Sequence, residues 1–289
     1  MSRTIAVLGA TGVYGRHLIP RLTRAGYAVR ALVRRPEVAG FARACGADVR
    51  AADIFDRASL CAALDGCDVG MNLATSLPGP SGRGDFAAND HLRREGTPTW
   101  VAAAQECGVK RILQQSIAMV NGNGQDWADE HTAFAGAQNE LATRAIDAAL
   151  SMEETVRAAN VDWLILRGGL FYGPGTGFDE DWLARAKAGT LRLPGDGEDF
   201  VSLVHIADMA NATLAAIERW PSRRAINVVD DEPVQWRDLF DYVAALANAA
   251  PPTAGGRLGF PSFRVRNTAA RDLLKWEPFY RTYRQGLSR

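Results

Sequence analysis

Three glycines near the start of the chain, Gly9, Gly12 and Gly15, have the spacing of a phosphate-binding turn. They follow a short apolar run at residues 4–8 and precede a helix-like stretch. Gly9 would permit a tight turn, Gly12 would let the backbone approach a pyrophosphate, and Gly15 would let the helix pack close to the strand. The pyrophosphate would bind free N–H groups at the positive end of that helix. This context predicts a dinucleotide site, and a purely structural turn is the alternative that the spacing alone allows.

Two arginines, Arg34 and Arg35, follow the second expected strand at residues 28–33. In this type of site, an acidic side chain at the end of strand two binds the ribose 2′-hydroxyl of NAD, whereas an arginine accepts the 2′-phosphate of NADP. Val33 and Arg34 occupy that corner and no carboxylate is present there. The sequence therefore predicts NADP(H), with solvated loop charges as the alternative interpretation of the two arginines.

Further cofactor contacts are expected at the ends of the next two strands, at residues 48–51 and 68–74. Asp53 could bind the adenine amino group, or it could cap a helix at residues 57–64. Leu73 and Ala74 should lie beside the cofactor, because ligands bind at the carboxyl ends of parallel strands. The full set expected to bind the cofactor is Gly9, Thr11, Gly12, Val13, Tyr14, Gly15, Arg34, Arg35, Asp53, Ile54, Leu73, Ala74 and Ser116.

The bulk composition excludes several classes of partner. The chain has 289 residues, of which 47% are apolar, and its formal net charge is zero, so it has no basic field for nucleic acid or for a membrane surface. No apolar run is long enough to span a bilayer, and the start of the chain lacks a signal peptide's pattern. The four cysteines show no metal-ligand spacing, so we expect reduced thiols, no metal and a cytoplasmic location.

Further along the chain, expected strands continue to alternate with expected helices, and the next two strands are at residues 110–115 and 162–167. A loop rich in Gly, Pro and Ser is expected at residues 76–90, and an alanine-rich helix at 138–159. Beyond residue 170 the pattern changes: a loop at 173–177, a short helix at 182–188, a strand at 201–206, a helix from Asp208, a strand at 226–229 and a helix at 236–248.

Several motifs together resemble the short-chain dehydrogenase/reductase superfamily, in its extended or atypical branch of epimerase/dehydratase-like enzymes. They are Gly9–Gly15, Asp53–Asp56, Leu73-Ala74, Glu95-Gly96-Thr97, Gln115-Ser116, Leu166–Gly175, Val204–Ala210 and Phe240. The resemblance implies an α/β fold, a doubly wound parallel (Rossmann) sheet with a small C-terminal substrate-binding region. Residues 1–170 would form the NADP-binding core, completed by about 201–230, and residues 171–200 and 231–289 would bind the substrate.

The sequence departs from that family in its catalytic machinery. The family uses a serine or threonine after strand five, and a tyrosine followed four residues later by a lysine, which lowers the pKa of the tyrosine. Counting from neighbouring motifs places the serine position on Ile117, one residue after Ser116, and the other two on Ala145 and Ala149. Residues 121–157 contain no tyrosine and no lysine. The usual proton donor is therefore missing.

Three residues are candidate substitutes, and each also has a structural interpretation. Ser116 could orient a substrate carbonyl or cap a turn. Tyr172 could donate a proton or simply pack with its hydroxyl bonded. His131, beside Asp129 and Glu130, could act as an acid or base near neutral pH, or belong to a solvated loop.

Other polar residues have weaker signals. Arg83, Arg93 and Arg94 could meet an anionic substrate, although each could equally be solvated, and Arg93 stands where relatives often have asparagine. His205 matches a structural position of the family, and Asp208 is expected to be a helix N-cap.

The sequence thus favours an NADP(H)-binding enzyme that acts on a small organic molecule, as a reductase, dehydrogenase or epimerase-like catalyst with a non-standard active site. A non-redox isomerase, cyclase or lyase with a structural cofactor is one alternative, and an NADP(H)-sensing regulator is another. The expected partner is a small-molecule substrate, with no nucleic acid and no membrane, and the long helices of such a fold are compatible with a homodimer.

Overall fold

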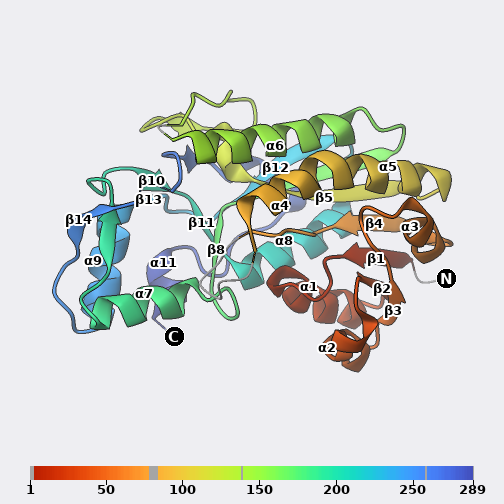
Figure 1. The fold of residues 1–289 in the computed structure, drawn as a ribbon, viewed down its shortest axis with the longest axis horizontal. Helices are drawn as coiled ribbons and strands as arrows, with labels where there is room; N and C mark the ends of the chain where they lie inside the picture. The colour runs from red at the N-terminus through yellow and green to blue at the C-terminus, as the bar shows by residue number, and fades with distance from the viewer. Residues whose placement is uncertain (1–2, 78–83, 138, 258, 289) are drawn as a thin grey trace.

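The computed structural model describes residues 3–77, 84–137, 139–257 and 259–288. Within them, seven parallel strands form one sheet in the order β12-β7-β5-β4-β1-β2-β3 (Figure 1). The strands are β1 (Thr4–Leu8), β2 (Ala28–Val33), β3 (Asp48–Ala51), β4 (Val69–Asn72), β5 (Arg111–Ile117), β7 (Asp162–Gly168) and β12 (Arg224–Val228). The chain runs outward from β1 to β3 and then returns to pair β4 on the other side of β1. The ends of β1 and β4 therefore form the switch point where doubly wound folds bind ligands.

Strand β1 shows how the sheet divides the core into two layers. Ile5 and Val7 belong to one buried apolar cluster, and Ala6 and Leu8 belong to another on the opposite face. Alternate side chains of a strand point to opposite faces, so an unbroken apolar run is required when both faces are covered. The sequence of β1 meets this requirement.

Helices cover both faces of the sheet. One face packs against α1 (Val13–Arg24), α2 (Gly40–Ala44), α8 (Ile206–Arg219) and α10 (Thr268–Leu274). The other packs against α3 (Arg57–Leu64), α5 (Thr97–Glu106) and α6 (Glu140–Arg157). A short helix α4 (Phe86–His91) and a π-helical turn η2 (Leu92–Gly96) lead directly into α5.

A smaller lobe lies at one end of the sheet, where α7 (Phe178–Lys187), α9 (Trp236–Leu246) and α11 (Tyr283–Leu287) gather (Figure 1). Pairs of short strands support these helices: β8 (Leu170–Tyr172) with β11 (Leu203–His205), β9 (Arg192–Pro194) with β14 (Thr253–Gly256), β10 (Phe200–Val201) with β13 (Val234–Gln235), and β6 (Trp127–Ala128) with β15 (Arg264–Val265). The lobe has its own buried aromatic cluster, in which Trp182 contacts Trp236 and Phe240.

Several element boundaries differ from the sequence-based expectation. The strand expected at 201–206 is two strands, and the second, β11, pairs with β8 outside the large sheet. The helix expected from residue 182 begins at Phe178, because Gly177 provides a left-handed N-cap (φ 79°). The loop expected at 76–90 ends in α4, and its residues 78–83 lie outside the described residues.

Candidate functional site

The glycine turn between β1 and α1 adopts a conformation that excludes side chains at two positions. Gly9 has φ +81°, and a Cβ there would lie 2.8 Å from the backbone nitrogen of Ala74. A Cβ on Gly15 would lie 2.5 Å from the carbonyl oxygen of Ala10, so α1 approaches the turn more closely than a larger residue permits. The absence of side chains at Gly9 and Gly15 therefore lets the start of α1 lie close to the ends of β1 and β4.

The N-terminus of α1 is open to an anion. Gly12 is its N-cap, no side chain caps it, and its first turn contains no acidic residue. A Cβ on Gly12 would meet only the carbonyl oxygen of Gly9, at 3.3 Å, and would otherwise project into open space. The free N–H groups and the helix dipole together favour a phosphate at this point.

A cavity of about 730 Å³ extends from this turn along the ends of β2 and β3. Its size and its glycine cradle fit an NAD-type dinucleotide. Of the residues predicted to bind the cofactor, those lining it are Gly9, Thr11, Gly12, Val13, Arg34, Asp53, Ile54, Leu73 and Ala74. Arg35 and Ser116 do not line it, Tyr14 lines only the neighbouring cavity, and Gly15 is a buried residue of α1.

Asp53 lies in this cavity, and the helix that follows it is capped by another residue. The carboxylate of Asp56 accepts hydrogen bonds from the backbone N–H groups of Ala58 and Ser59, so Asp56 is the N-cap of α3. Asp53 accepts instead from the N–H of Phe55 at 3.1 Å, which fixes the turn after β3. The helix-capping alternative for Asp53 is therefore wrong.

A second cavity, of about 520 Å³, adjoins the first and reaches toward the small lobe. The two share Gly9, Gly12, Val13, Arg34, Leu73, Thr75, Ser76 and Gly175. The far wall of the second cavity is largely apolar and comes from α6 and the lobe: Leu141, Ala142, Ala145, Ile146, Leu170, Phe171, Phe178, Phe260 and Pro261. A substrate in the second cavity would thus lie directly against a dinucleotide in the first.

Helix α6 contributes the methyl groups of Ala142 and Ala145 to the wall of the second cavity, and Ala145 is the position where the sequence comparison predicted the family's tyrosine to be missing. Ala145 lines the second cavity, and no lysine is found among its described lining residues. Tyr14 is the one tyrosine among those described residues, and its hydroxyl is hydrogen-bonded to the hydroxyl of Thr213. Burial raises the pKa of Tyr14 well above its ordinary value, which makes it a weak acid.

The sequence that forms this fold and this glycine cradle matches a known family of enzymes. The model of the NAD dependent epimerase/dehydratase family matches residues 5–228. The chain belongs to this family. The predicted family and the predicted doubly wound parallel sheet are both confirmed.

Relatives of this family member include reductases. A 3-diazoavenalumate denitrifying reductase from a Streptomyces species is 32% identical over 310 residues, which cover 99% of this chain and 99% of the relative. A 4-hydroxy-2-methyl-3-oxo-4-farnesyl-3,4-dihydroquinoline-1-oxide ketoreductase from Stigmatella aurantiaca is 28% identical over 81% of this chain and 70% of its own length.

The fold is also similar to that of solved structures. A dTDP-glucose 4,6-dehydratase from Bacillus anthracis, in complex with NAD, superposes with a TM-score of 0.82 over 99% of this chain and 94% of its own, at 16% identity. Its membership in the NAD dependent epimerase/dehydratase family makes this protein an enzyme of the oxidoreductase or epimerase type with an NAD-type cofactor.

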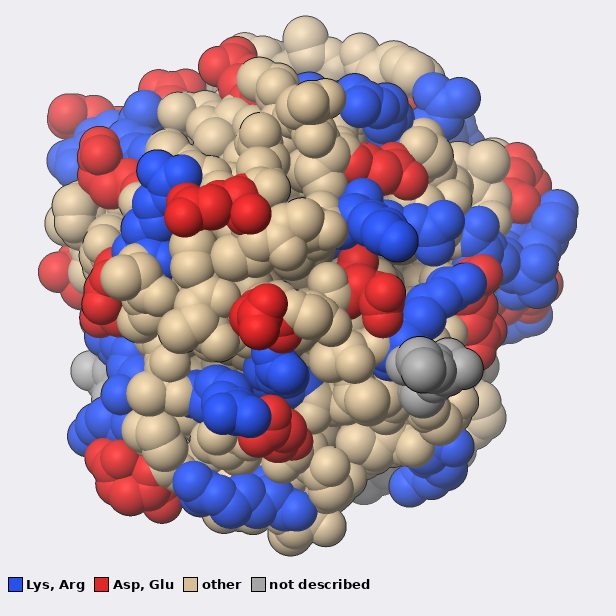
Figure 2. All heavy atoms as spheres, turned by 90° about the vertical axis from the view of Figure 1, so that its right-hand side faces the viewer, with Lys and Arg blue, Asp and Glu red and all other residues tan. Residues whose placement is uncertain are grey.

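The surface and helices of this epimerase/dehydratase family member bear on its partners. Figure 2 shows Lys and Arg interspersed with Asp and Glu over one face, without a broad field of a single sign. Among the described residues, none of the helices combines the length and the apolar character that a membrane span requires.

Ser116 is placed in a buried polar network beneath α6. Its hydroxyl donates to Oε1 of Glu153 at 2.7 Å, and the residue has no exposed surface. Glu153 is also bound by the guanidinium of Arg167, whose Nη1 donates to Oδ1 of Asn121 at 2.8 Å. The sequence did not reveal this network, because its members come from β5, η3 (Ala118–Asn121), α6 and β7. The signal that could have indicated it is a glutamate on an otherwise apolar face of a helix.

Tyr172 and His131 lie in different surroundings and, like Ser116, line neither cavity. Tyr172 is fully buried, its hydroxyl lies 3.4 Å from the carbonyl oxygen of Thr282, and burial raises its pKa well above the ordinary value. His131 is exposed, and its backbone N–H donates to Oδ1 of Asp129 at 2.9 Å. The structure does not bring the three candidate catalytic residues together in one cavity.

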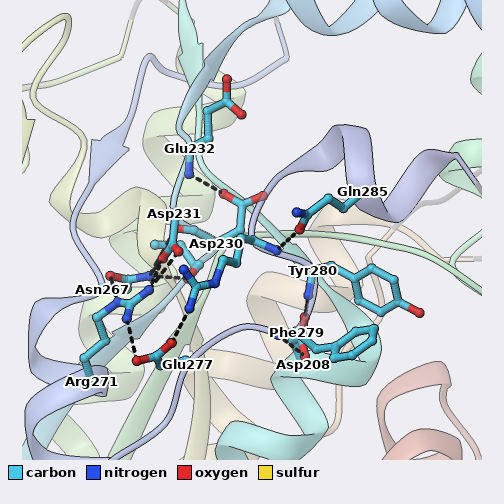
Figure 3. Close-up of polar contacts among 12 residues, drawn as sticks. Asp208, Asp230, Asp231, Glu232, Asn267, Arg271, Glu277, Phe279, Tyr280 and Gln285 are labelled. Carbon is cyan, nitrogen blue, oxygen red and sulfur yellow. Dashed lines mark hydrogen bonds and ion pairs between the residues drawn. The ribbon is translucent and has the colours of Figure 1, made fainter.

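The expected N-cap at Asp208 is also wrong. His205 caps α8, because its Nδ1 accepts a hydrogen bond from the N–H of Ala207 at 3.2 Å. The carboxylate of Asp208 accepts instead from the backbone N–H groups of Phe279 and Tyr280, at 3.0 and 2.8 Å (Figure 3). Asp208 thereby fastens the C-terminal segment to α8.

Proposed function

We propose that this protein is an NADP(H)-dependent reductase that transfers hydride to a small organic substrate without a side-chain proton donor. The observation that carries the proposal is the alanine-lined wall of α6 beside the glycine cradle, with Ala145 at the substrate cavity. An enzyme that must protonate an alkoxide keeps an acid at this point, and losing such an acid costs about 10²–10⁴-fold in rate. A substrate that needs no proton removes that requirement.

Arg34 supports the choice of NADP(H) over NAD(H). It follows the last residue of β2 and lines the dinucleotide cavity. An arginine at this corner pairs with a ribose 2′-phosphate, whereas NAD-specific relatives of the fold use a carboxylate there. Asp53 follows the end of the next strand, β3, and its Oδ1 accepts a hydrogen bond from the N–H of Phe55, so the residue that directly follows β2 at this corner is the cation Arg34.

The name of the Streptomyces relative suggests a reaction that suits such a site. Bound reduced nicotinamide would supply a hydride. If the substrate is a diazonium ion, the carbon that bears the N₂⁺ group accepts the hydride pair, the C–N bond breaks, and its electron pair leaves with N₂. A cationic diazonium and a hydride give a neutral product and N₂, so charge and protons balance without an acid. We infer a substrate of this electron-poor type, with the apolar wall of the second cavity excluding water.

The experiment is a reduction followed at the absorbance band of reduced nicotinamide. Purified protein, NADPH and an arenediazonium salt are compared with the same mixture lacking protein. We expect enzyme-dependent oxidation of NADPH, an equal amount of N₂, and deuterium from labelled NADPH on the ring carbon that carried nitrogen. Substrate turnover with unchanged NADPH would instead support non-redox catalysis, and NADPH binding without any turnover would support a sensor. Either result would overturn the proposal.

A further inference from the structure

The guanidinium of Arg93 is buried in the wall of the second cavity. Only 3% of the residue is exposed, yet it is one of the residues that line the cavity. It lies in the π-helical turn η2, and turns of this kind inside helices are common at functional sites. The helical ladder there is widened by one residue, and Arg93 is presented to α6 across the cavity wall.

The guanidinium has few partners for a buried charge. Nη1 donates to the carbonyl oxygen of Ala145 at 2.9 Å, and this is its one hydrogen bond within the described residues. Asp90 and Glu153 act on Arg93 electrostatically without an ion-pair contact, and Glu153 is already bound by Arg167. Burial lowers the pKa of Arg93 to about 10, so the group stays charged at neutral pH. Arginine has five N–H donors, so the donors of Arg93 other than the one bound to Ala145 are available to a ligand. An anionic ligand would also offset the cost of burying this charge without a paired carboxylate.

The charged side chains that line the second cavity are all positive. Among its described lining residues, Arg34 and Arg93 are charged, and none is a carboxylate. Arg34 is exposed and stands at the dinucleotide end, whereas Arg93 is buried beside α6. Apolar side chains from Leu77, Phe86, Ile117 and Met119 complete the wall around this single buried cation.

We propose that the second cavity takes an organic molecule that carries a carboxylate on an apolar body, and that this carboxylate pairs with the guanidinium of Arg93. The inference rests on the function proposed above, because it treats this cavity as the substrate site. The apolar body would lie against α6 and the lobe, and a planar carboxylate matches the paired donors of arginine. Arg93 is then a specificity-determining residue, while the reacting carbon lies nearer the glycine cradle.

The test uses two unreactive probes, 3-phenylpropionate and 3-phenylpropionamide, which share a shape but differ in charge. Each is titrated calorimetrically into protein saturated with NADP⁺. We expect the wild-type protein to bind the acid about 10- to 100-fold more tightly than the amide, the range of a charged hydrogen bond. In Arg93→Gln the preference should fall close to one. In Arg94→Gln, which removes an exposed charge from the same turn, it should persist.

Three results would overturn the inference: equal binding of acid and amide by the wild-type protein, no binding of either probe, or an unchanged preference in Arg93→Gln. Should that variant fail to fold, Arg93→Lys keeps the charge without the planar fork and is expected to lose part of the preference. An undiminished preference in the lysine variant would count against Arg93. The proposed function fails separately, through absent NADP⁺ binding or absent hydride transfer, while the acid preference still stands.

Discussion

The guanidinium of Arg167 binds the carboxylate of Glu153 through two hydrogen bonds, Nε to Oε1 at 2.9 Å and Nη2 to Oε2 at 2.6 Å. Both side chains are almost completely buried, with 5% and 2% of their surfaces exposed. The pair joins β7 to α6, the helix that also contributes to the wall of the second cavity. Its geometry is the bidentate arrangement that makes arginine–carboxylate pairs strong and directional.

Breaking this pair should destabilise the protein severely. We expect Glu153→Gln to lower the free energy of unfolding by about 3–5 kcal/mol, because it leaves the Arg167 charge buried without its counter-ion. Arg157 also contacts Glu153, at 3.2 Å, but its side chain is 41% exposed. Arg157→Gln is therefore a matched control that should cost less than about 1 kcal/mol. Urea denaturation of both variants measures the difference, and equal losses would contradict this account.

The same pair predicts a dependence of stability on pH. Burial alone would raise the pKa of Glu153, but the hydrogen bonds and charge of Arg167 and the hydroxyl of Ser116 outweigh it, so the pKa lies below its ordinary 4.5. A carboxylate with a lowered pKa in the folded state stabilises fully above its unfolded pKa, and this contribution is lost as pH falls through and below that value. The stability gap between wild type and Glu153→Gln should narrow in acid, and a constant gap would argue against the pair.

Gly12 and Gly15 should respond differently to the same added methyl group. A Cβ on Gly12 projects into the cradle, so Gly12→Ala should weaken NADP(H) binding by about 5- to 150-fold, the equivalent of an overpacking cost of about 1–3 kcal/mol, with little loss of stability. A Cβ on Gly15 meets the backbone of Ala10, so Gly15→Ala should cost about 1–3 kcal/mol of stability. Cofactor titration and thermal unfolding separate the two effects, and the reverse pattern would exclude the cradle as the phosphate site.

Arg34 and Arg35 form a second matched pair. Of these two arginines, Arg34 lines the dinucleotide cavity and Arg35 does not. Arg34→Gln should weaken NADPH binding by about tenfold or more, the loss of one charged hydrogen bond, and leave NADH binding nearly unchanged. Arg35→Gln should affect neither. Dissociation constants for both cofactors decide the matter, and a wild-type protein that prefers NADH would reject the assignment of NADP(H).

Asp230 is a buried carboxylate whose ionisation opposes folding. It is 2% exposed, its Oδ1 accepts from the N–H of Glu232 at 3.2 Å, and its Oδ2 has no partner among the described residues (Figure 3). Burial raises its pKa well above 3.8, and the nearby charges of Asp231, Glu232 and Asp208 add to the shift. With its pKa raised in the folded state, the carboxyl contributes most at low pH, and stability falls as pH rises through that pKa.

Asp230→Asn should therefore stabilise the protein at neutral pH, by about 1–3 kcal/mol, with a smaller gain in acid. Asp231→Asn is the control, because Asp231 accepts two hydrogen bonds from Nη2 of Arg271, at 2.6 and 2.7 Å (Figure 3). Removing the charge of Asp231 should destabilise the protein. Melting temperatures across a pH series test both. A destabilised Asp230→Asn variant at neutral pH would show that its charge is satisfied.

The sequence by itself determined the sheet, the cradle and the missing acid. A run such as Ile5–Leu8 is apolar at every position, so it must be buried on both faces, and the glycine spacing after it is a local property of one turn. The absence of tyrosine and lysine between residues 121 and 157 is likewise visible without coordinates. Local backbone sterics and side-chain periodicity therefore account for these features.

Only the tertiary structure decided which polar side chains reach the site. Ser116 and Arg93 were both plausible from their types, but Ser116 is held by Glu153, 37 residues away, whereas Arg93 lines the cavity through a contact with Ala145, 52 residues away. Asp208 similarly does not cap its own helix, and its carboxylate instead accepts hydrogen bonds from the backbone N–H groups of Phe279 and Tyr280. A buried polar group must satisfy its hydrogen bonds wherever partners converge, and packing between distant elements decides where that is.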